Sequence, residues 1–203
     1  IDSNGTAEEV ILAWAKVLRD VSQLNSTTIG KIGIGMPGLV DFETGVLTFI
    51  TGERYGSLYN SNLKELLAAQ LKISSSDIRM LGDAMSFLQG EVFGGAGRGF
   101  KRSLGVTLGI GLGTARYNSG VAVDAKLYDM PLHDGIAEDY ICVKWLIDRY
   151  KALSGIQIKD ISELKQVAAG DQRVTQVFEE FAENISLFLT SFIGQGNPEI
   201  VII

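Results

Sequence analysis

The pattern of apolar and polar positions first predicts an amphipathic helix near the start of the chain. Thr6-Ala-Glu-Glu9 has the form of a capping box, in which a hydroxyl and a carboxylate satisfy backbone N–H groups at a helix start. Apolar residues then recur at helical spacing, at Val10, Trp14, Val17, Leu18 and Val21. A strand is predicted next, over 28–36, and a hairpin over 39–47 that turns at 43–45.

Helices and strands alternate along the rest of the chain. Helices are predicted over 62–71, 84–93, 135–150, 161–169 and 171–194, and strands over 78–81, 104–108 and 114–117. Residues 48–59 have no period and are predicted to form a loop. The final Glu199-Ile-Val-Ile-Ile203 is predicted to be an interior strand. Strands interleaved with helices, together with a hairpin, predict an α/β fold with a mixed sheet.

Glycine is the compositional outlier. It occupies 24 of 203 positions, about 12% against a typical level of roughly 7%. The run Gly94-Gly-Ala-Gly-Arg-Gly99 is predicted to be a flexible junction. We therefore expect two domains, an N-terminal lobe over 1–97 and a C-terminal lobe over 98–203.

Charge and composition exclude several classes of function. The net charge is −6 and the sequence pI is about 4.9, which argues against a nucleic-acid partner or an anionic membrane surface. One cysteine (Cys142) excludes an internal disulfide, and one histidine (His133) excludes a His-rich metal site. No apolar run has the length of a membrane helix. The single cysteine and histidine fit a reducing cytosol, so we expect a cytoplasmic protein. The chain lacks an initial Met and ends on a bare apolar run, so we expect it to be a fragment.

Two of the three glycine motifs fail on their context. Gly33-Ile-Gly-Met-Pro-Gly38 has the spacing of a dinucleotide fingerprint, but Pro37 precedes a hairpin strand rather than a helix. The run 94–99 has the spacing of a phosphate-binding P-loop, but Phe100 stands where lysine is required.

The third motif, Gly109-Ile-Gly-Leu-Gly113-Thr114, lies between two predicted strands. Glycine at alternate positions allows backbone N–H groups to approach a phosphate without interference from Cβ atoms. A glycine-rich hairpin without any ligand explains the turn equally well, so both interpretations remain open.

Single polar residues have ordinary structural explanations. Asp83 stands between a strand and a helix, where a carboxylate is often only an N-cap. Glu138 in the first turn of a helix is typical of a favourable dipole partner. His133 is expected on the surface and Cys142 in the core.

Taken in order, however, the motifs resemble those of the ROK family (repressors, open reading frames, kinases). Six segments carry the resemblance: 32–41 with Gly45, Asn62-Leu63, Gly82-Asp83-Ala84, Gly90-Glu91, 94–97 with Gly99, and 107–113. It implies the actin/hexokinase-like (ribonuclease H-like) ATPase fold, with two lobes of mixed sheets and flanking helices. A sugar and ATP with Mg²⁺ would meet in a cleft between the lobes, and the protein would be a homodimer.

The resemblance also assigns roles to individual positions. Asp83 would be the general base that takes the proton of the attacking sugar hydroxyl. The positions that would contact the sugar are Pro37, Gly38, Gly82 and Glu138. The positions that would line the ATP phosphates are Gly109, Gly111, Gly113 and Thr114.

The sequence departs from the family pattern at several points. Gly82 replaces an Asn that binds sugar, and Ile110 replaces the Thr of a Gly-Thr-Gly turn. A Gly-Glu-x-Gly-His segment has no counterpart after Gly120, and a single cysteine rules out the family's structural zinc cluster. The remaining segments of the ATP site would lie before Ile1 and after Ile203.

Three functions are compatible with these observations. The first is an ATP-dependent kinase acting on a glucose-like hexose. The second is a sugar-sensing or regulatory protein that has lost the chemistry. The third is a kinase for an amino or acylated sugar.

Overall fold

The computed structural model describes residues 4–24, 27–36, 39–49, 55–167 and 170–203. The chain divides into two compact units, Ile1–Ser86 and Phe87–Ile203. The division falls within helix α3 (Asp83–Gly94), upstream of the glycine-rich run. That run is an ordered turn of the second unit, because the Ala96 N–H donates to Glu91 Oε2 at 2.8 Å and the Gly97 N–H to Glu91 O at 3.0 Å. The boundary at 97/98 stays a prediction.

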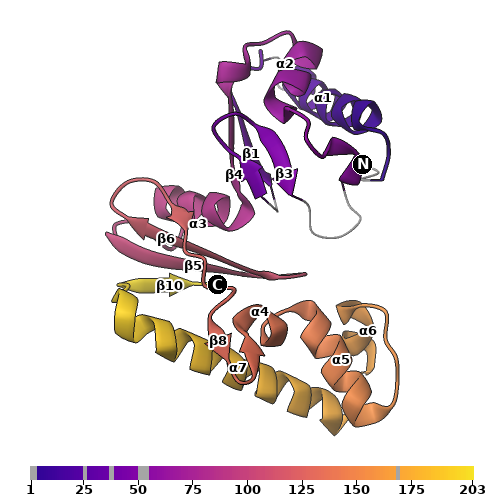
Figure 1. Ribbon diagram of the computed structural model, residues 1–203, viewed down its shortest axis with the longest axis vertical. Coiled ribbons are helices and arrows are strands. Elements are labelled where there is room, and N and C mark those ends of the chain that lie inside the picture. The colour runs from indigo at the N-terminus through magenta and orange to yellow at the C-terminus, as the bar shows by residue number, and fades with distance from the viewer. Residues whose placement is uncertain (1–3, 25–26, 37–38, 50–54, 168–169) are drawn as a thin grey trace. The chain divides into compact units, whose positions relative to one another are not determined.

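The first unit packs two helices with a parallel pair of strands (Figure 1). Its elements are α1 (Ala7–Leu24), β1 (Ile32–Met36), β2 (Leu39–Asp41), β3 (Val46–Phe49), η1 (Gly56–Leu58), α2 (Leu63–Leu71), η2 (Ser75–Asp77) and β4 (Ile78–Gly82). Strand β1 pairs with β4 in parallel, and β2 pairs with β3 in the predicted antiparallel hairpin. The predicted strand 28–36 begins only at Ile32. Trp14 of α1 packs edge-to-face on Tyr55, with ring centroids 5.9 Å apart.

The helix starts of this unit follow the capping residues. The Thr6 N–H donates to Glu9 Oε2 at 2.8 Å and the Glu9 N–H to Thr6 Oγ1 at 3.3 Å, so the capping box is confirmed. The Glu65 N–H donates to Asn62 Oδ1 at 3.1 Å, which begins α2.

A buried lysine fixes the β2–β3 turn. Lys64 is 8% exposed, and its Nζ donates to the carbonyl oxygens of Phe42 and Glu43, both at 2.7 Å. Gly45 has a φ of +84°, and a Cβ there would lie 2.6 Å from Lys64 Cγ. Glycine is therefore required twice at this position, by the backbone and by the lysine stem.

The second unit contains a four-stranded mixed sheet in the order β10-β5-β6-β7. Besides the C-terminal part of α3, its elements are β5 (Arg102–Leu108), β6 (Leu112–Asn118), β7 (Val123–Asp124), β8 (Pro131–Leu132), β9 (Gly135–Ile136), α4 (Ala137–Tyr140), α5 (Val143–Ser154), α6 (Ile161–Val167), α7 (Gln172–Gly196) and β10 (Ile200–Ile202). Strand β10 is parallel to β5, and the other pairs are antiparallel. Among the described residues β10 has a strand on one side only, so it lies at an edge, where an interior strand was predicted.

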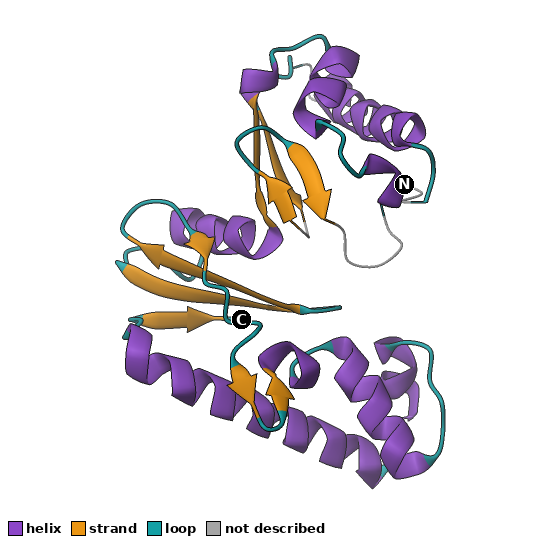
Figure 2. Cartoon of the chain, in the orientation of Figure 1, coloured by secondary structure: helices purple, strands orange, loops and turns teal. Residues whose placement is uncertain are grey.

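Helices cover both faces of this sheet (Figure 2). On one face, Leu88 of α3 lies so close to β5 that a Cβ at Gly105 would be 2.9 Å from Leu88 Cβ. On the other face, Phe188 and Phe192 of α7 join the core formed by Leu104 and Val106. Side chains alternate between the two faces along β5, as expected of a strand.

The single helix predicted over 135–150 is wrong. The segment instead forms strand β9 of a short hairpin with β8, then α4, then α5. The backbone is extended at Ile136 (φ −115°, ψ 163°) and again at Cys142 (φ −151°, ψ 165°), which separates the two helices. Apolar periodicity cannot register such an interruption, because Ala137, Ile141 and Leu146 stay buried on both sides of it.

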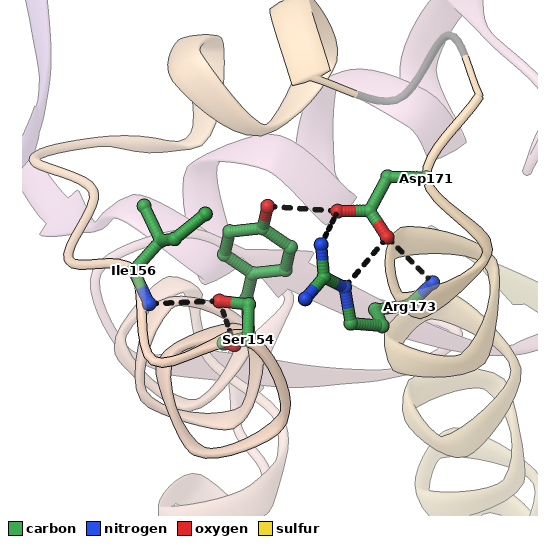
Figure 3. A network of polar contacts seen from close by, with 5 residues as sticks. Ser154, Ile156, Asp171 and Arg173 are labelled. Atoms are coloured by element: carbon green, nitrogen blue, oxygen red, sulfur yellow. Dashed lines mark hydrogen bonds and ion pairs between the residues drawn. The ribbon is translucent and has the colours of Figure 1, made fainter.

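A polar network joins α5 to the start of α7 (Figure 3). Asp171 is the N-cap of α7, and its carboxylate accepts the Arg173 backbone N–H at 3.0 Å and the Tyr150 hydroxyl at 3.0 Å. The Arg173 guanidinium donates to both carboxylate oxygens, at 2.8 and 3.0 Å. These bonds, with that of the Arg173 side chain the strongest, lower the pKa of Asp171 to about 2.

Candidate functional site

Asp83 lies where the resemblance places a catalytic base, at the end of β4 and the first residue of α3. The residue is exposed. Its Oδ1 accepts the Ala84 N–H at 2.7 Å, which leaves Oδ2 without a partner among the described residues. The carboxylate therefore caps the helix with one oxygen and keeps the other open to solvent.

The neighbours of Asp83 in the first unit are small. A Cβ at Gly82 would lie 2.9 Å from Met85 Cε, so a larger residue here requires Met85 to move. A Cβ at Gly35 would lie 3.1 Å from Ser86 Oγ, so this glycine allows β1 to approach the start of α3. Pro37 and Gly38, expected on the sugar side, lie outside the described residues.

The glycine turn 109–113 connects β5 to β6 in the second unit. The Gly109 N–H donates to Gly111 O at 3.1 Å, and the Val143 N–H at the start of α5 donates to Gly109 O at 2.9 Å. Thr114 differs from the glycines because it is buried and its Oγ1 accepts the Leu127 N–H at 3.0 Å. Its hydroxyl therefore supports the strand beneath the turn.

Glu138 contacts this turn directly. Its Oε2 accepts the Leu112 N–H at 2.9 Å, and a Cβ at Gly111 would lie 2.4 Å from the same oxygen. The structure thus brings together two features that the sequence analysis placed about 25 positions apart, the proposed sugar-binding carboxylate and the proposed phosphate-binding turn. It also explains why position 111 lacks a side chain.

The four-residue helix α4 that carries Glu138 is too short to be stable alone and is held by its surroundings. The Ala137 N–H donates to Met130 O at 2.8 Å, and the Glu138 N–H to Tyr128 O at 2.9 Å. At its end, Asn184 Nδ2 of α7 donates to Tyr140 O at 3.4 Å. These contacts fix the backbone of Glu138 without using its side-chain carboxylate.

His133 has partners that the sequence analysis missed. It lies exposed in the β8–β9 hairpin, as predicted, yet Nε2 is 2.8 Å from Asn184 Oδ1, and the ring packs edge-to-face on Tyr140. Asn184 is 6% exposed in the middle of α7. A polar residue on the apolar stripe of α7 was the one available signal for this network.

A cavity of about 480 Å³ borders Glu138 and the tip of the turn. It is lined by Ile110, Glu138, Asp139, Cys142, Lys144, Trp145, Asp148, Arg149 and Ala152. Cys142 is buried as predicted, but it caps α5 and faces this cavity rather than lying on a helix face. Trp145 stacks on Phe181, with ring centroids 5.9 Å apart. The cavity therefore combines an aromatic wall with groups of both charges.

Sequence relatives of the chain are sugar kinases. A glucokinase of Thermotoga maritima is 33% identical over 106 residues, which are 52% of this chain and 31% of the relative. An N-acetylgalactosamine kinase of Shewanella sp. is 21% identical over 203 residues, covering 86% of this chain and 62% of the relative. No family model matches the chain.

Solved structures of ROK-family proteins have the same fold as this chain. The ROK hexokinase of Thermus thermophilus superposes with a TM-score of 0.80 at 20% identity, over 98% of this chain and 70% of that one. A ROK-family glucokinase of Streptomyces griseus, solved with glucose and AMPPNP, gives 0.74 at 20% identity over 98% and 72%. The chain has the fold of the ROK family, and its homologues are sugar kinases. A ROK-family transcriptional regulator also matches, with a TM-score of 0.75 at 16% identity over 95% of this chain and 54% of the regulator.

The chain spans between about a third and two thirds of the length of the curated sequence relatives it matches. Within the described part of the chain, no three His, Cys, Asp or Glu side chains are grouped to bind a metal ion. No described helix is both long enough and apolar enough to cross a membrane.

Proposed function

We propose that the protein containing this chain transfers the γ-phosphoryl group of ATP to a hydroxyl group of a glucose-like hexose. The contact of Glu138 with the glycine turn carries the proposal, because it joins the proposed sugar-binding carboxylate to the proposed phosphate-binding turn within one unit. The glucose and AMPPNP held by the Streptomyces griseus relative support the same pair of ligands.

The glycine turn fits a phosphate group. The N–H groups of Ile110 and Gly111 donate to no acceptor among the described residues, and Ile110 is 79% exposed. Such amides bind anions without the cost of breaking an internal hydrogen bond. Gly109, Gly111 and Gly113 would line the ATP phosphates, and Thr114 would hold the turn through its buried hydroxyl. When bound, ATP would supply the phosphoryl group, and Mg²⁺ would neutralise the charge of its phosphates.

Asp83 would act as the base through its open oxygen. Phosphoryl transfer requires that the sugar hydroxyl be oriented and relieved of its proton, and a solvent-facing carboxylate at a helix start can do both. Glu138 would accept hydrogen bonds from the hydroxyls of the sugar ring, and Gly82, Pro37 and Gly38 would lie around the sugar. A homodimer and a cytoplasmic location are expected from the resemblance.

The test is the Asp83→Asn variant of the complete protein, assayed with ATP, Mg²⁺ and a panel of glucose, mannose and N-acetylated hexosamines. We expect turnover to fall about 10²–10⁴-fold, because the amide cannot take the proton. Asp20→Asn on the exposed surface of α1 removes the same charge and should keep wild-type turnover. Equal turnover by wild type and Asp83→Asn rejects Asp83 as the base.

A sugar-binding regulator is the second candidate. Gly82 lacks a polar group where the family carries Asn, and a transcriptional regulator shares the fold. Calorimetry of the complete protein separates the two functions. Sugar binding without nucleotide binding or turnover supports the regulator, whereas ATP-dependent formation of a sugar phosphate excludes it. A preference for N-acetylated hexosamines in the panel would instead indicate the third function, which the Shewanella relative favours.

A further inference from the structure

Three consecutive backbone N–H groups at the tip of the glycine turn differ in whether they donate a hydrogen bond. The N–H groups of Ile110 and Gly111 have no acceptor among the described residues. The next one, of Leu112, donates to the Glu138 carboxylate at 2.9 Å. The turn therefore already binds one anion, and that anion is a side chain of the same unit.

A phosphate at the turn and the carboxylate in this position would repel each other. Both are anions, and they would occupy neighbouring N–H groups a few ångströms apart, where like charges are strongly unfavourable. Glu138 Oε2 also lies close against the turn, since a Cβ at Gly111 would be 2.4 Å from it. One of the two groups has to leave when the other binds.

The Glu138 side chain can leave without disrupting α4. The backbone of α4 is held by the Met130 and Tyr128 carbonyls and by Asp139, whose Oδ2 accepts the Ile136 N–H at 3.0 Å. None of these bonds uses the Glu138 carboxylate. The cavity of about 480 Å³ that it borders provides the space for a second rotamer.

We propose that Glu138 is an internal competitor of the nucleotide phosphate, bound to the Leu112 amide when the turn is empty and displaced into the adjoining cavity when a phosphate binds. The proposal rests on the proposed function and adds a regulation of that site. Because displacement frees the carboxylate for sugar hydroxyls, nucleotide raises the affinity for sugar, and sugar raises the affinity for nucleotide by the same factor.

Calorimetric titration of the complete protein with AMPPNP and Mg²⁺ tests the competition. Without the carboxylate, Glu138→Gln and Glu138→Ala are expected to bind AMPPNP about tenfold more tightly than wild type, while glucose binding weakens. In both variants, the coupling between the two ligands should disappear. The matched control is Asp148→Asn, which removes a charge from the same cavity without touching the turn and should change the AMPPNP affinity less than twofold.

The outcomes separate this inference from the proposed function. If wild type binds AMPPNP and the Glu138 variants bind it equally or more weakly, the competition is wrong and the kinase function stands. If wild type shows the competition but phosphorylates no hexose, the kinase function is wrong and the competition stands. If no variant binds AMPPNP, both are wrong.

A second variant keeps the carboxylate and serves if the Glu138 variants do not fold. In Gly111→Ala the new Cβ displaces the flexible end of Glu138, so the Leu112 amide should exchange its hydrogen about tenfold faster by NMR. In Gly109→Ala, where a Cβ meets nothing within 4 Å, the Leu112 amide should exchange as in wild type. Unchanged exchange in Gly111→Ala would show that Glu138 does not protect this amide, and would overturn the proposal.

Discussion

Lys64 shows how one residue can fix a turn that the sequence pattern leaves free. Its ammonium group is buried and replaces lost hydration with two backbone carbonyls at 2.7 Å. Hydrogen bonds from Thr44 and the nearby Lys64 charge also lower the pKa of Asp41 at the start of the same turn. A lysine in the predicted helix over 62–71 gives no sign of such burial, so this contact could not be predicted from the sequence.

Removing the Lys64 ammonium should destabilise the first unit. Lys64→Met keeps the apolar stem but leaves the Phe42 and Glu43 carbonyls without a donor, which costs about 1–3 kcal/mol. Denaturant unfolding of the complete protein, followed by a signal of the first unit, measures the loss. Lys72→Met on the exposed end of α2 is the matched control. A variant as stable as wild type would show that the ammonium contributes nothing net.

At the residue scale, the sequence predicted which residues begin a helix better than it predicted contacts between residues far apart in the chain. The capping residues Thr6 and Glu9 act as predicted, because capping depends on a few neighbouring backbone groups. The contact of Glu138 with Leu112 depends on a turn and a helix folding against each other. The pattern of neighbouring residues gives no information on the distance between Glu138 and Leu112.

At the scale of elements, α7 begins with a carboxylate that several donors keep ionised. Asp171 has a pKa of about 2, lowered from 3.8, so its contribution to stability is complete above about pH 4 and is lost as the pH falls through about 2. The predicted helix start at this residue is confirmed. The sequence did not indicate that the Tyr150 hydroxyl of α5 donates a hydrogen bond to this carboxylate. The network to which this bond belongs is shown in Figure 3.

The pH dependence of this cap can be measured. Asp171→Asn should lower the melting temperature by a few degrees at pH 7, since the charge-assisted bonds to Arg173 are lost. The difference from wild type should shrink as the pH is lowered from about 4 to 2, where wild-type Asp171 becomes protonated. Asp129→Asn, at an exposed loop position, is the control. A difference that stays constant down to pH 2 would contradict the assignment.

Helices and strands long enough to show a repeating apolar pattern were predicted well, whereas strands of two residues were not. Helices α2, α3 and α7 and strands β4, β5 and β6 lie where the pattern places them, within a few residues. The β8–β9 hairpin was missed because each of its strands has only two residues, too few to show a period of two, and because its tip has no glycine but His133, with a φ of +53°.

At the scale of the whole molecule, the order of motifs gave the fold and the family resemblance that the comparisons support. Composition excluded a disulfide and a His-rich metal site from residue counts alone. The domain boundary and the roles of the site residues remain predictions, because they depend on ligands and on the assembled protein.

Metal removal provides a test at this scale. Dialysis of the complete protein against a chelator should abolish phosphorylation until Mg²⁺ is restored, since the phosphates need the cation. The melting temperature without nucleotide should change by less than about 1 °C, because this chain, with one Cys and one His, lacks the cysteines of the family's zinc cluster. A large fall in melting temperature would reveal a structural metal.

The two tryptophans of the chain are divided between the units, Trp14 against Tyr55 in the first and Trp145 against Phe181 in the second. Replacing either with phenylalanine leaves one tryptophan in this chain, so tryptophan emission, excited at wavelengths where tyrosine does not absorb, can follow each unit separately during denaturation. Trp145 also lines the cavity beside Glu138. Its quenching or spectral shift would give an optical titration of any compound that enters there, without a label.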